Sequence, residues 1–164
     1  MSNTESKEYV LKRMDEEWPK FAAILDSIPD GDYDIPGVVD EWCLKELLGH
    51  VNFWAAKAAH DVQAAGAGRP EEIETPGGDA NVDKWNAREA AKGKAMQPAE
   101  LKALVQTSHD EARNALEAAP ESALAIDISG WTVGVRFAED TYRHYREHGE
   151  QIGAWVRESE TSEE

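Results

Sequence analysis

The 164-residue chain is 41% hydrophobic and 30% charged, which is ordinary for a single globular domain. Its formal net charge of −16 opposes binding to nucleic-acid phosphates or to an anionic membrane surface, and no apolar run is long enough to span a membrane. The single cysteine, Cys43, excludes an internal disulfide framework, and the first residues lack the pattern of a signal peptide. We therefore expect a cytoplasmic protein with no nucleic-acid and no membrane partner.

The first half of the chain predicts two helices. Within residues 6–28, apolar side chains recur at helical spacing at Val10, Met14, Trp18, Phe21, Leu25 and Ile28. A proline–glycine segment should end this helix, and residues 29–43 then form a loop. The second helix should run from Leu44 to Ala65 and end at Gly66, with Cys43 as an unfavourable N-cap.

The second half predicts at least two more helices. Asp79 is a good N-cap for one of them, and Pro98 suits the first turn of another that continues to Leu116. The two segments are either one kinked helix or two separate helices. Residues 123–131 alternate apolar and polar side chains, and we expect a plain connection there rather than a short hairpin. Thr132 can cap the last helix, which should end near Arg157.

Helices of this length with short connections predict an all-α fold of the four-helix-bundle type. Residues 1–157 should form its single domain. Residues 158–164 are rich in glutamate, and we expect them to be a disordered acidic tail.

The last helix carries two histidines in the stripe that should face the core. This stripe consists of Phe137, Thr141, His144, His148, Ile152 and Trp155. The opposite face has glutamate and arginine side chains at i,i+4 spacing, as solvated faces usually do. Two buried imidazoles without partners would be costly, whereas the same i,i+4 spacing lets both bind one cation. The alternative is a pair of histidines that hydrogen-bond to neighbouring side chains.

A third histidine makes the metal hypothesis stronger. His50 borders the apolar stripe of the second helix, and bundles build metal sites from side chains on facing helices. Three protein ligands with open positions are typical of a catalytic metal. We therefore predict a metal site formed by His50, His144 and His148, whereas His60 and His109 should lie on the surface.

Three further residues are candidates for the surroundings of this site. Asn86 lies on the inward side of its helix, where an amide needs a partner, and Trp54 either lines the pocket or belongs to the core. Asp140 lies one turn before His144. It could support that histidine, or it could simply be a carboxylate that the helix dipole favours.

Three segments resemble a known family. The sequence from Trp42 to Val51 resembles the second-helix signature of the DinB-like superfamily, and that from Asp140 to Ile152 resembles its last helix. Residues 82–87 are similar to the third-helix segment. Cys43 departs from the pattern, because relatives usually have Ser or Thr at this position.

The resemblance implies a four-helix bundle of up-down-down-up topology, with His50, His144 and His148 holding a divalent metal. Zinc or nickel is expected first, with iron or manganese as alternatives. It further implies a homodimer and a thiol-dependent S-transferase, in which the metal activates a low-molecular-weight thiol that attacks a small electrophile. Metal-assisted hydrolysis would use the same site. Two alternatives are a metal-independent self-protection or small-molecule-binding protein of the colibactin-resistance type, and a metal-stabilised module without catalysis.

Overall fold

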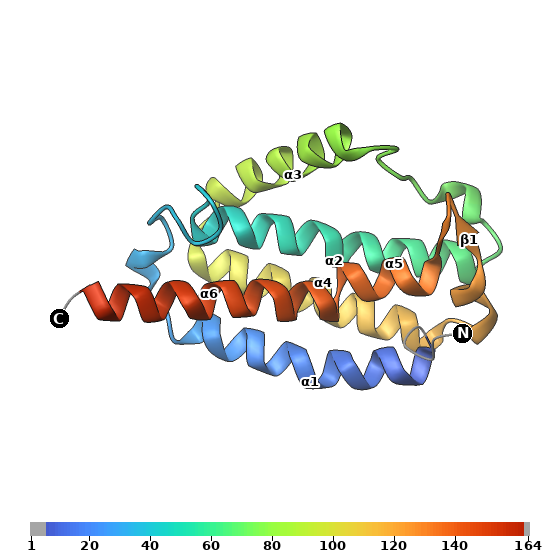
Figure 1. Cartoon of the computed structure of the whole chain (residues 1–164). Coiled ribbons are helices and arrows are strands. Elements are labelled where there is room, and N and C mark those ends of the chain that lie inside the picture. Colours follow the sequence, from blue (N-terminus) through green and yellow to red (C-terminus); the bar gives the residue numbers. More distant parts are fainter. Residues whose placement is uncertain (1–5, 163–164) are drawn as a thin grey trace.

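The computed structural model describes residues 6–162, and its regular structure is almost entirely helical (Figure 1). The helices are α1 (Lys7–Asp26), α2 (Leu44–Gly66), α3 (Asp79–Lys94), α4 (Pro98–Ala118), α5 (Val133–Asp140) and α6 (Tyr142–Ser162). The short elements are the 3-10 turns η2 (Asp30–Asp32), η3 (Pro70–Glu72) and η4 (Glu121–Ala125) and the strands β1 (Asp127–Ile128) and β2 (Trp131–Thr132). Within residues 6–162, no helix has the length and apolar character needed to cross a membrane.

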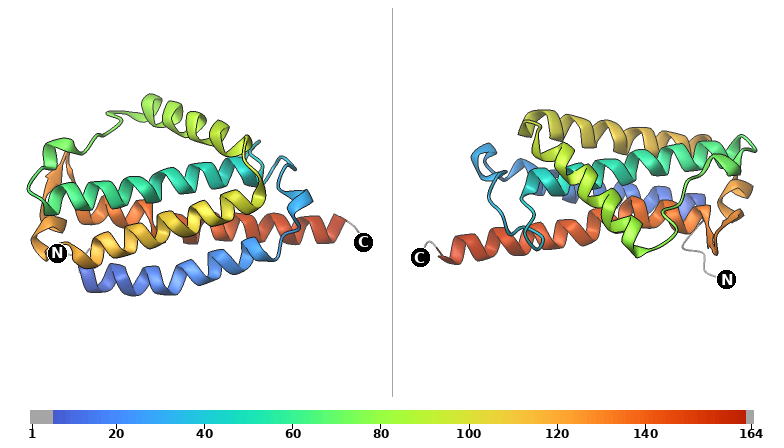
Figure 2. Two further views of the ribbon diagram at one scale, coloured as in Figure 1. Left: turned by 180° about the vertical axis from the view of Figure 1, so that it is seen from behind. Right: turned by 90° about the horizontal axis from the view of Figure 1, so that it is seen from above.

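Four helical rods form the bundle, with α5 and α6 together making the fourth. In Figure 1, α1 and the α5–α6 rod run in one direction, while α2 and α4 run in the other. This is the expected up-down-down-up topology, and the all-α prediction is confirmed. Helix α3 is a connecting helix outside the bundle. It packs on α2 and crosses it at an angle, as the view from above shows (Figure 2).

Two local predictions need correction, and one open alternative is decided. The segments on either side of residues 93–97 are two separate helices rather than one kinked helix, because α3 and α4 run in opposite directions. Residues 127–132 form a hairpin rather than a plain connection, with Ile128 paired to Trp131 and Gly130 in the left-handed region that its turn requires. Helix α6 continues past Arg157 to Ser162, so residues 158–162 of the predicted disordered tail are helical. Residues 163–164 of that tail lie outside the described residues.

The predicted last helix is interrupted at Thr141. Thr132 caps α5 as expected, since its side chain accepts a hydrogen bond from the Val135 N–H. At Thr141 the backbone leaves the helical region (φ −119°, ψ −101°), and the hydroxyl donates to the carbonyl of Phe137 at 2.7 Å. A threonine hydroxyl bonded in this way commonly bends a helix. As a result α5 packs on α2, whereas α6 packs on α1.

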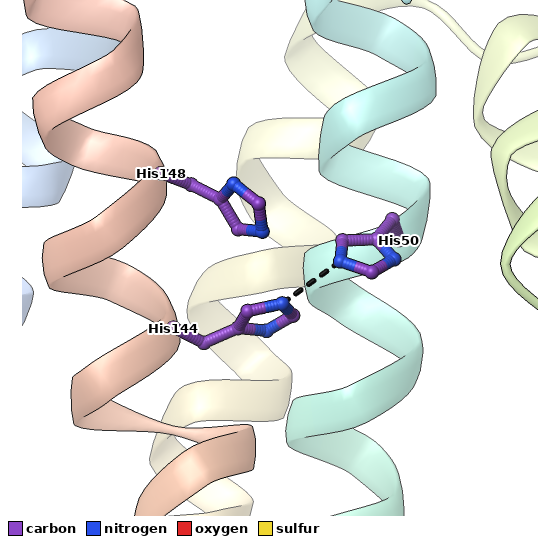
Figure 3. A group of neighbouring side chains, drawn as sticks. All are labelled: His50, His144 and His148. Carbon is purple, nitrogen blue, oxygen red and sulfur yellow. Dashed lines mark hydrogen bonds between the residues drawn. The ribbon is translucent and has the colours of Figure 1, made fainter. Parts of the chain in front are cut away.

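The buried apolar side chains form two clusters along the bundle. One includes Ala58 of α2 and Phe137 of α5, and the other includes Val51 of α2 and Ile152 of α6. The three histidines lie near the boundary between the two clusters. Two of them, His144 and His148, follow the break at Thr141 in the chain. Just after this break, the imidazole rings of His144 and His148 point from α6 toward His50 on α2 (Figure 3).

Two glycines bring α3 into backbone contact with α2. A Cβ atom on Gly49 would overlap the carbonyl oxygen of Glu89, and a Cβ atom on Gly93 would overlap that of Lys45. Only glycine permits so close a crossing. Because Gly49 directly precedes His50, the crossing also brings the preceding turns of α3, which carry Asn86, within reach of that histidine.

Candidate metal centre

His50, His144 and His148 converge in the space between α2 and α6 (Figure 3). Each offers a ring nitrogen, and the three nitrogens lie within 4.8 Å of one another. The Nε2 atoms of His50 and His144 are 2.8 Å apart. His50 and His148 are 7% and 6% exposed, so their rings are largely removed from water. The predicted set of three histidines therefore comes together as one cluster.

Hydrogen bonds on its far side fix the proton position of His50. The indole N–H of Trp54 donates to Oδ1 of Asn86 at 2.8 Å, and Nδ1 of His50 lies 3.1 Å from the same oxygen. An indole nitrogen can only donate, so the atom it meets must be the amide oxygen. Nδ1 of His50 must then carry the proton, and its Nε2 presents a lone pair to the cluster. Asn86 and Trp54, both predicted near the site, thus orient one of its rings.

The other two rings differ in their surroundings. Nδ1 of His148 donates to Oε1 of Gln151 at 2.6 Å, which leaves Nε2 of His148 free on the side of the cluster. Since Nε2 of His50 is an acceptor, Nε2 of His144 donates to it. Nδ1 of His144 is buried and has no hydrogen-bond partner among the described residues. Leaving a polar atom buried and unpaired costs stability, which is more typical of a functional site than of a structural one.

All three imidazoles are held in the neutral form. Burial lowers the pKa of His50 to about 4, helped by the nearby His148 and partly opposed by the hydrogen bond to Asn86. Burial also lowers the pKa of His144 well below its usual value, and the two neighbouring histidines add to the effect. The pKa of His148 is lowered by burial, against the opposing effects of Gln151 and Glu147. At neutral pH each ring therefore has a lone pair available, which is the form that binds metals.

These residues fit a divalent cation. The single hydrogen bond at 2.8 Å satisfies only His50 and His144, whereas a cation that displaced its proton would accept a lone pair from each of the three rings. Neutral imidazole suits zinc, copper, iron and nickel, and contacts from the far side of such rings are usual at metal sites. Three neutral ligands would also leave the full charge of the ion available to a further ligand.

Asp140 does not take the supporting position suggested for it. It ends α5, and no hydrogen bond joins it to the three histidines within the part of the chain that the structure describes. Burial raises the pKa of its carboxyl group well above the usual value, and Lys57 opposes this effect. Asp140 therefore belongs to a group of charges between α2 and α5.

The structure separates the two remaining histidines. The side chain of His60 is 57% exposed, as expected for a surface residue. His109 is buried at 4% exposure, so its predicted surface position is wrong. Its ring stacks on Trp18 with a centroid distance of 4.4 Å, and its Nδ1 lies 3.1 Å from the hydroxyl of Tyr145. His109 thus packs among α1, α4 and α6, away from the cluster.

Sequence reasoning missed two neighbours of the cluster. Gln151 binds His148, and its signal was the i,i+3 spacing that places two side chains on one helix face. Trp42 packs against His50 with ring centroids 5.2 Å apart, although it lies in the loop before α2. No periodic pattern could have placed Trp42 there.

The comparisons with known proteins agree with this architecture. The sequence model described as "Mycothiol maleylpyruvate isomerase N-terminal domain" matches residues 14–161. The chain belongs to this family. No curated protein matches the chain in sequence. Among solved structures, an uncharacterised protein from Escherichia coli UTI89 is similar with a TM-score of 0.81 and 18% identity, over 95% of each chain.

Two further structures are similar to this member of the maleylpyruvate isomerase N-terminal family. The colibactin self-resistance protein ClbS, solved in complex with double-stranded DNA, has a TM-score of 0.79 and 15% identity over 93% of this chain and 96% of its own. DfsB, described as a sibling lethal factor precursor, has a TM-score of 0.78 and 16% identity over 94% and 96% of the two chains. These likenesses establish the fold alone. With the family match they place the chain in the DinB-like superfamily.

Proposed function

We propose that the protein is a metal-dependent S-transferase that joins a low-molecular-weight thiol to a small electrophile. The observation that carries the proposal is the convergence of three neutral imidazoles within 4.8 Å between α2 and α6. Membership of a family named after a mycothiol-dependent isomerase supports a thiol as the cosubstrate. His50, His144 and His148 would hold the ion. Such an ion lowers the pKa of a coordinated thiol and supplies a thiolate at neutral pH.

The protein's own residues have separate tasks in this proposal. Asn86 keeps the proton of His50 on Nδ1, and Trp54 holds Asn86 in position. Gln151 orients His148 in the same way. Trp42 covers one side of His50 and limits the access of water to that ring. These contacts preorganise the lone pairs of His50 and His148 for binding an ion, and the proton on Nε2 of His144 would have to leave for the third ring to bind.

A thiol-transfer assay tests the proposal. The metal-loaded protein would be incubated with monobromobimane and, in turn, with cysteine, glutathione, mycothiol or bacillithiol. We expect one thiol to react faster than without protein, and we expect a chelator or His148→Ala to remove the acceleration. His60→Ala is the matched control, because this histidine is exposed on the same helix as His50. Equal rates with and without the chelator would contradict the metal-dependent mechanism.

A second candidate is a metal-independent self-protection protein that binds or opens a reactive small molecule. The likeness to the self-resistance protein ClbS along 93% of the chain favours it. This candidate predicts that the protein protects against its reactive substrate equally well after chelation and in His148→Ala. The chelator experiment therefore separates the two candidates.

A further inference from the structure

A second site lies on the other side of α2, in the wedge between α2 and α3. The two helices touch at Gly49 and Gly93 and separate toward the start of α3 (Figures 1 and 2). In the widening part lies a cavity of about 490 Å³, which is within the usual size range of small-molecule sites. Its walls come from both helices, from the end of η3 and from the segment after it.

Aromatic rings form the apolar part of this cavity. Phe53 and Trp85 line it and meet edge to face at 5.9 Å, and Trp54 stacks on Trp85 at 6.1 Å. The rings are only half-buried, although aromatic side chains gain most from full burial. They therefore offer apolar surface to a ligand body in the cavity.

Most charges on the cavity wall already have partners. Lys57 is bound to Asp61 at 2.7 Å, and His60 lies 3.1 Å from the same carboxylate. Glu72 is bound to Arg69 at 3.1 Å. Three of the five ionisable groups that line the cavity are thus compensated by residues of the protein.

Two charges of opposite sign are left with little or no compensation. Arg88 lies over the rings of Phe53 and Trp85 at 5.5 and 5.7 Å, and its nearest carboxylate is Glu89 at 3.8 Å. Glu89 is closer to Lys92, at 3.0 Å. Glu74 has no ion pair or hydrogen bond among the described residues. The cavity therefore presents an available guanidinium and an available carboxylate beside aromatic surface.

We propose that the wedge between α2 and α3 binds a small zwitterion, with an apolar or aromatic body on Phe53 and Trp85, an anionic group on Arg88 and a cationic group on Glu74. The guanidinium suits a carboxylate because it can donate two parallel hydrogen bonds. The site is distinct from the histidine cluster and needs no metal. It is connected to the cluster through Trp54, which contacts both Trp85 and the Asn86 that orients His50.

Three probes that share one benzene ring test the charge requirement. These are 4-(aminomethyl)benzoate as the zwitterion, benzoate as the anion and benzylamine as the cation. Binding to full-length, chelator-treated protein would be measured by NMR titration of the Trp85 indole N–H signal, assigned with Trp85→Phe. We expect the zwitterion to bind at least about fivefold more tightly than either single-charge probe. Failure of the metal proposal would not affect this measurement.

Two variants assign the charges to residues. Arg88→Gln should weaken the zwitterion and benzoate but not benzylamine, and Glu74→Gln should weaken the zwitterion and benzylamine but not benzoate. Arg157→Gln, on the far end of α6, is the matched control and should change none of the three. The proposal is overturned if the wild type does not bind the zwitterion, if it does not prefer it, or if the two variants affect all probes equally.

Discussion

At the scale of single residues, the orientation of His50 depends on a chain of two hydrogen bonds. Trp54 fixes the amide of Asn86, and Asn86 fixes the proton of His50 on the nitrogen away from the cluster. Partners of this kind keep a metal-binding imidazole in the correct tautomer and orientation. Asn86 therefore affects the site without being a ligand.

Replacing Asn86 by leucine should weaken metal binding while leaving all three histidines in place. Loss of a partner on the far side of a ligand typically costs about 10- to 100-fold in metal affinity, and we expect an effect in this range. Competition with a chromophoric chelator would measure it. Asn114→Leu, at an exposed position of α4, is the control. Equal affinities of Asn86→Leu and the wild type would show that the hydrogen bond to His50 has no role in binding.

His109 should make the protein less stable as the pH falls. Burial lowers its pKa from 6.5 to about 4, while Asp15 and Asp110 oppose this and Arg113 adds to it. As the pH falls, His109 therefore takes up a proton in the unfolded chain before it does so in the folded chain. Its contribution to the free energy of unfolding is fully present above its pKa in the unfolded chain, and it is lost as the pH falls toward its pKa in the folded chain. Between about pH 7 and pH 5 the loss from His109 alone is about 2 kcal/mol.

His109→Phe keeps a ring against Trp18 and removes the titration. Its free energy of unfolding, measured in urea at both pH values, should fall less between pH 7 and pH 5 than that of the wild type, by the same ~2 kcal/mol. The three clustered histidines titrate in both proteins, so they cancel in the difference. Parallel pH profiles would mean that His109 is not protected from protonation in the folded protein.

The histidine cluster was accessible to sequence reasoning because its signals are periodic. His144 and His148 continue an apolar stripe, and His50 borders one. His109 also fits the stripe of its helix, four residues after Val105 and three before Ala112. A lone histidine beside the charged Asp110 nevertheless favours a surface position. Its partners Trp18 and Tyr145 come from other helices, and a single helix pattern does not show them.

At the scale of elements, the close crossing of α2 and α3 should tolerate no side chain at Gly49. Gly49→Ala would force the two backbones apart, and overpacking of this kind typically costs about 1–3 kcal/mol in the free energy of unfolding. Gly153→Ala on α6 is the matched control, because its Cβ would meet only the end of the Arg157 side chain at 3.4 Å. Alanine also favours a helix over glycine by about 1 kcal/mol.

Urea unfolding followed by circular dichroism would compare these variants. We expect Gly49→Ala to be clearly less stable than the wild type and Gly153→Ala to be equal or more stable. If both alanine variants matched the wild type, the backbone contact at the crossing would be absent in solution.

Helix type and order followed from hydrophobic periodicity, but the places where helices break did not. The stripe from Phe137 to Trp155 continues unbroken through Thr141, because the side-chain pattern hardly changes when the axis bends. The break depends on one side-chain hydrogen bond and on the different partners of α5 and α6. The reversal of direction between α3 and α4 likewise depends on tertiary packing. The interruption of the helical pattern at residues 93–97 permits this reversal but does not specify it.

At the scale of the whole molecule, the net charge of −16 should prevent binding to duplex DNA. The similar structure of ClbS was solved with double-stranded DNA, so the shared fold makes this expectation worth testing. In an electrophoretic mobility shift experiment at about 150 mM salt, we expect no shift of a random duplex at micromolar protein. A salt-dependent shift would reveal a local cationic surface that outweighs the overall charge.

The most direct test of the account is the metal content of the protein, purified without a nickel column and measured by mass spectrometry after incubation with zinc. The three converging histidines predict about one ion per chain in the wild type and in His60→Ala, and much less in His144→Ala with its helical circular dichroism retained. A well-folded wild type that takes up no zinc, nickel, iron or manganese would contradict the metal centre and direct attention to metal-independent binding.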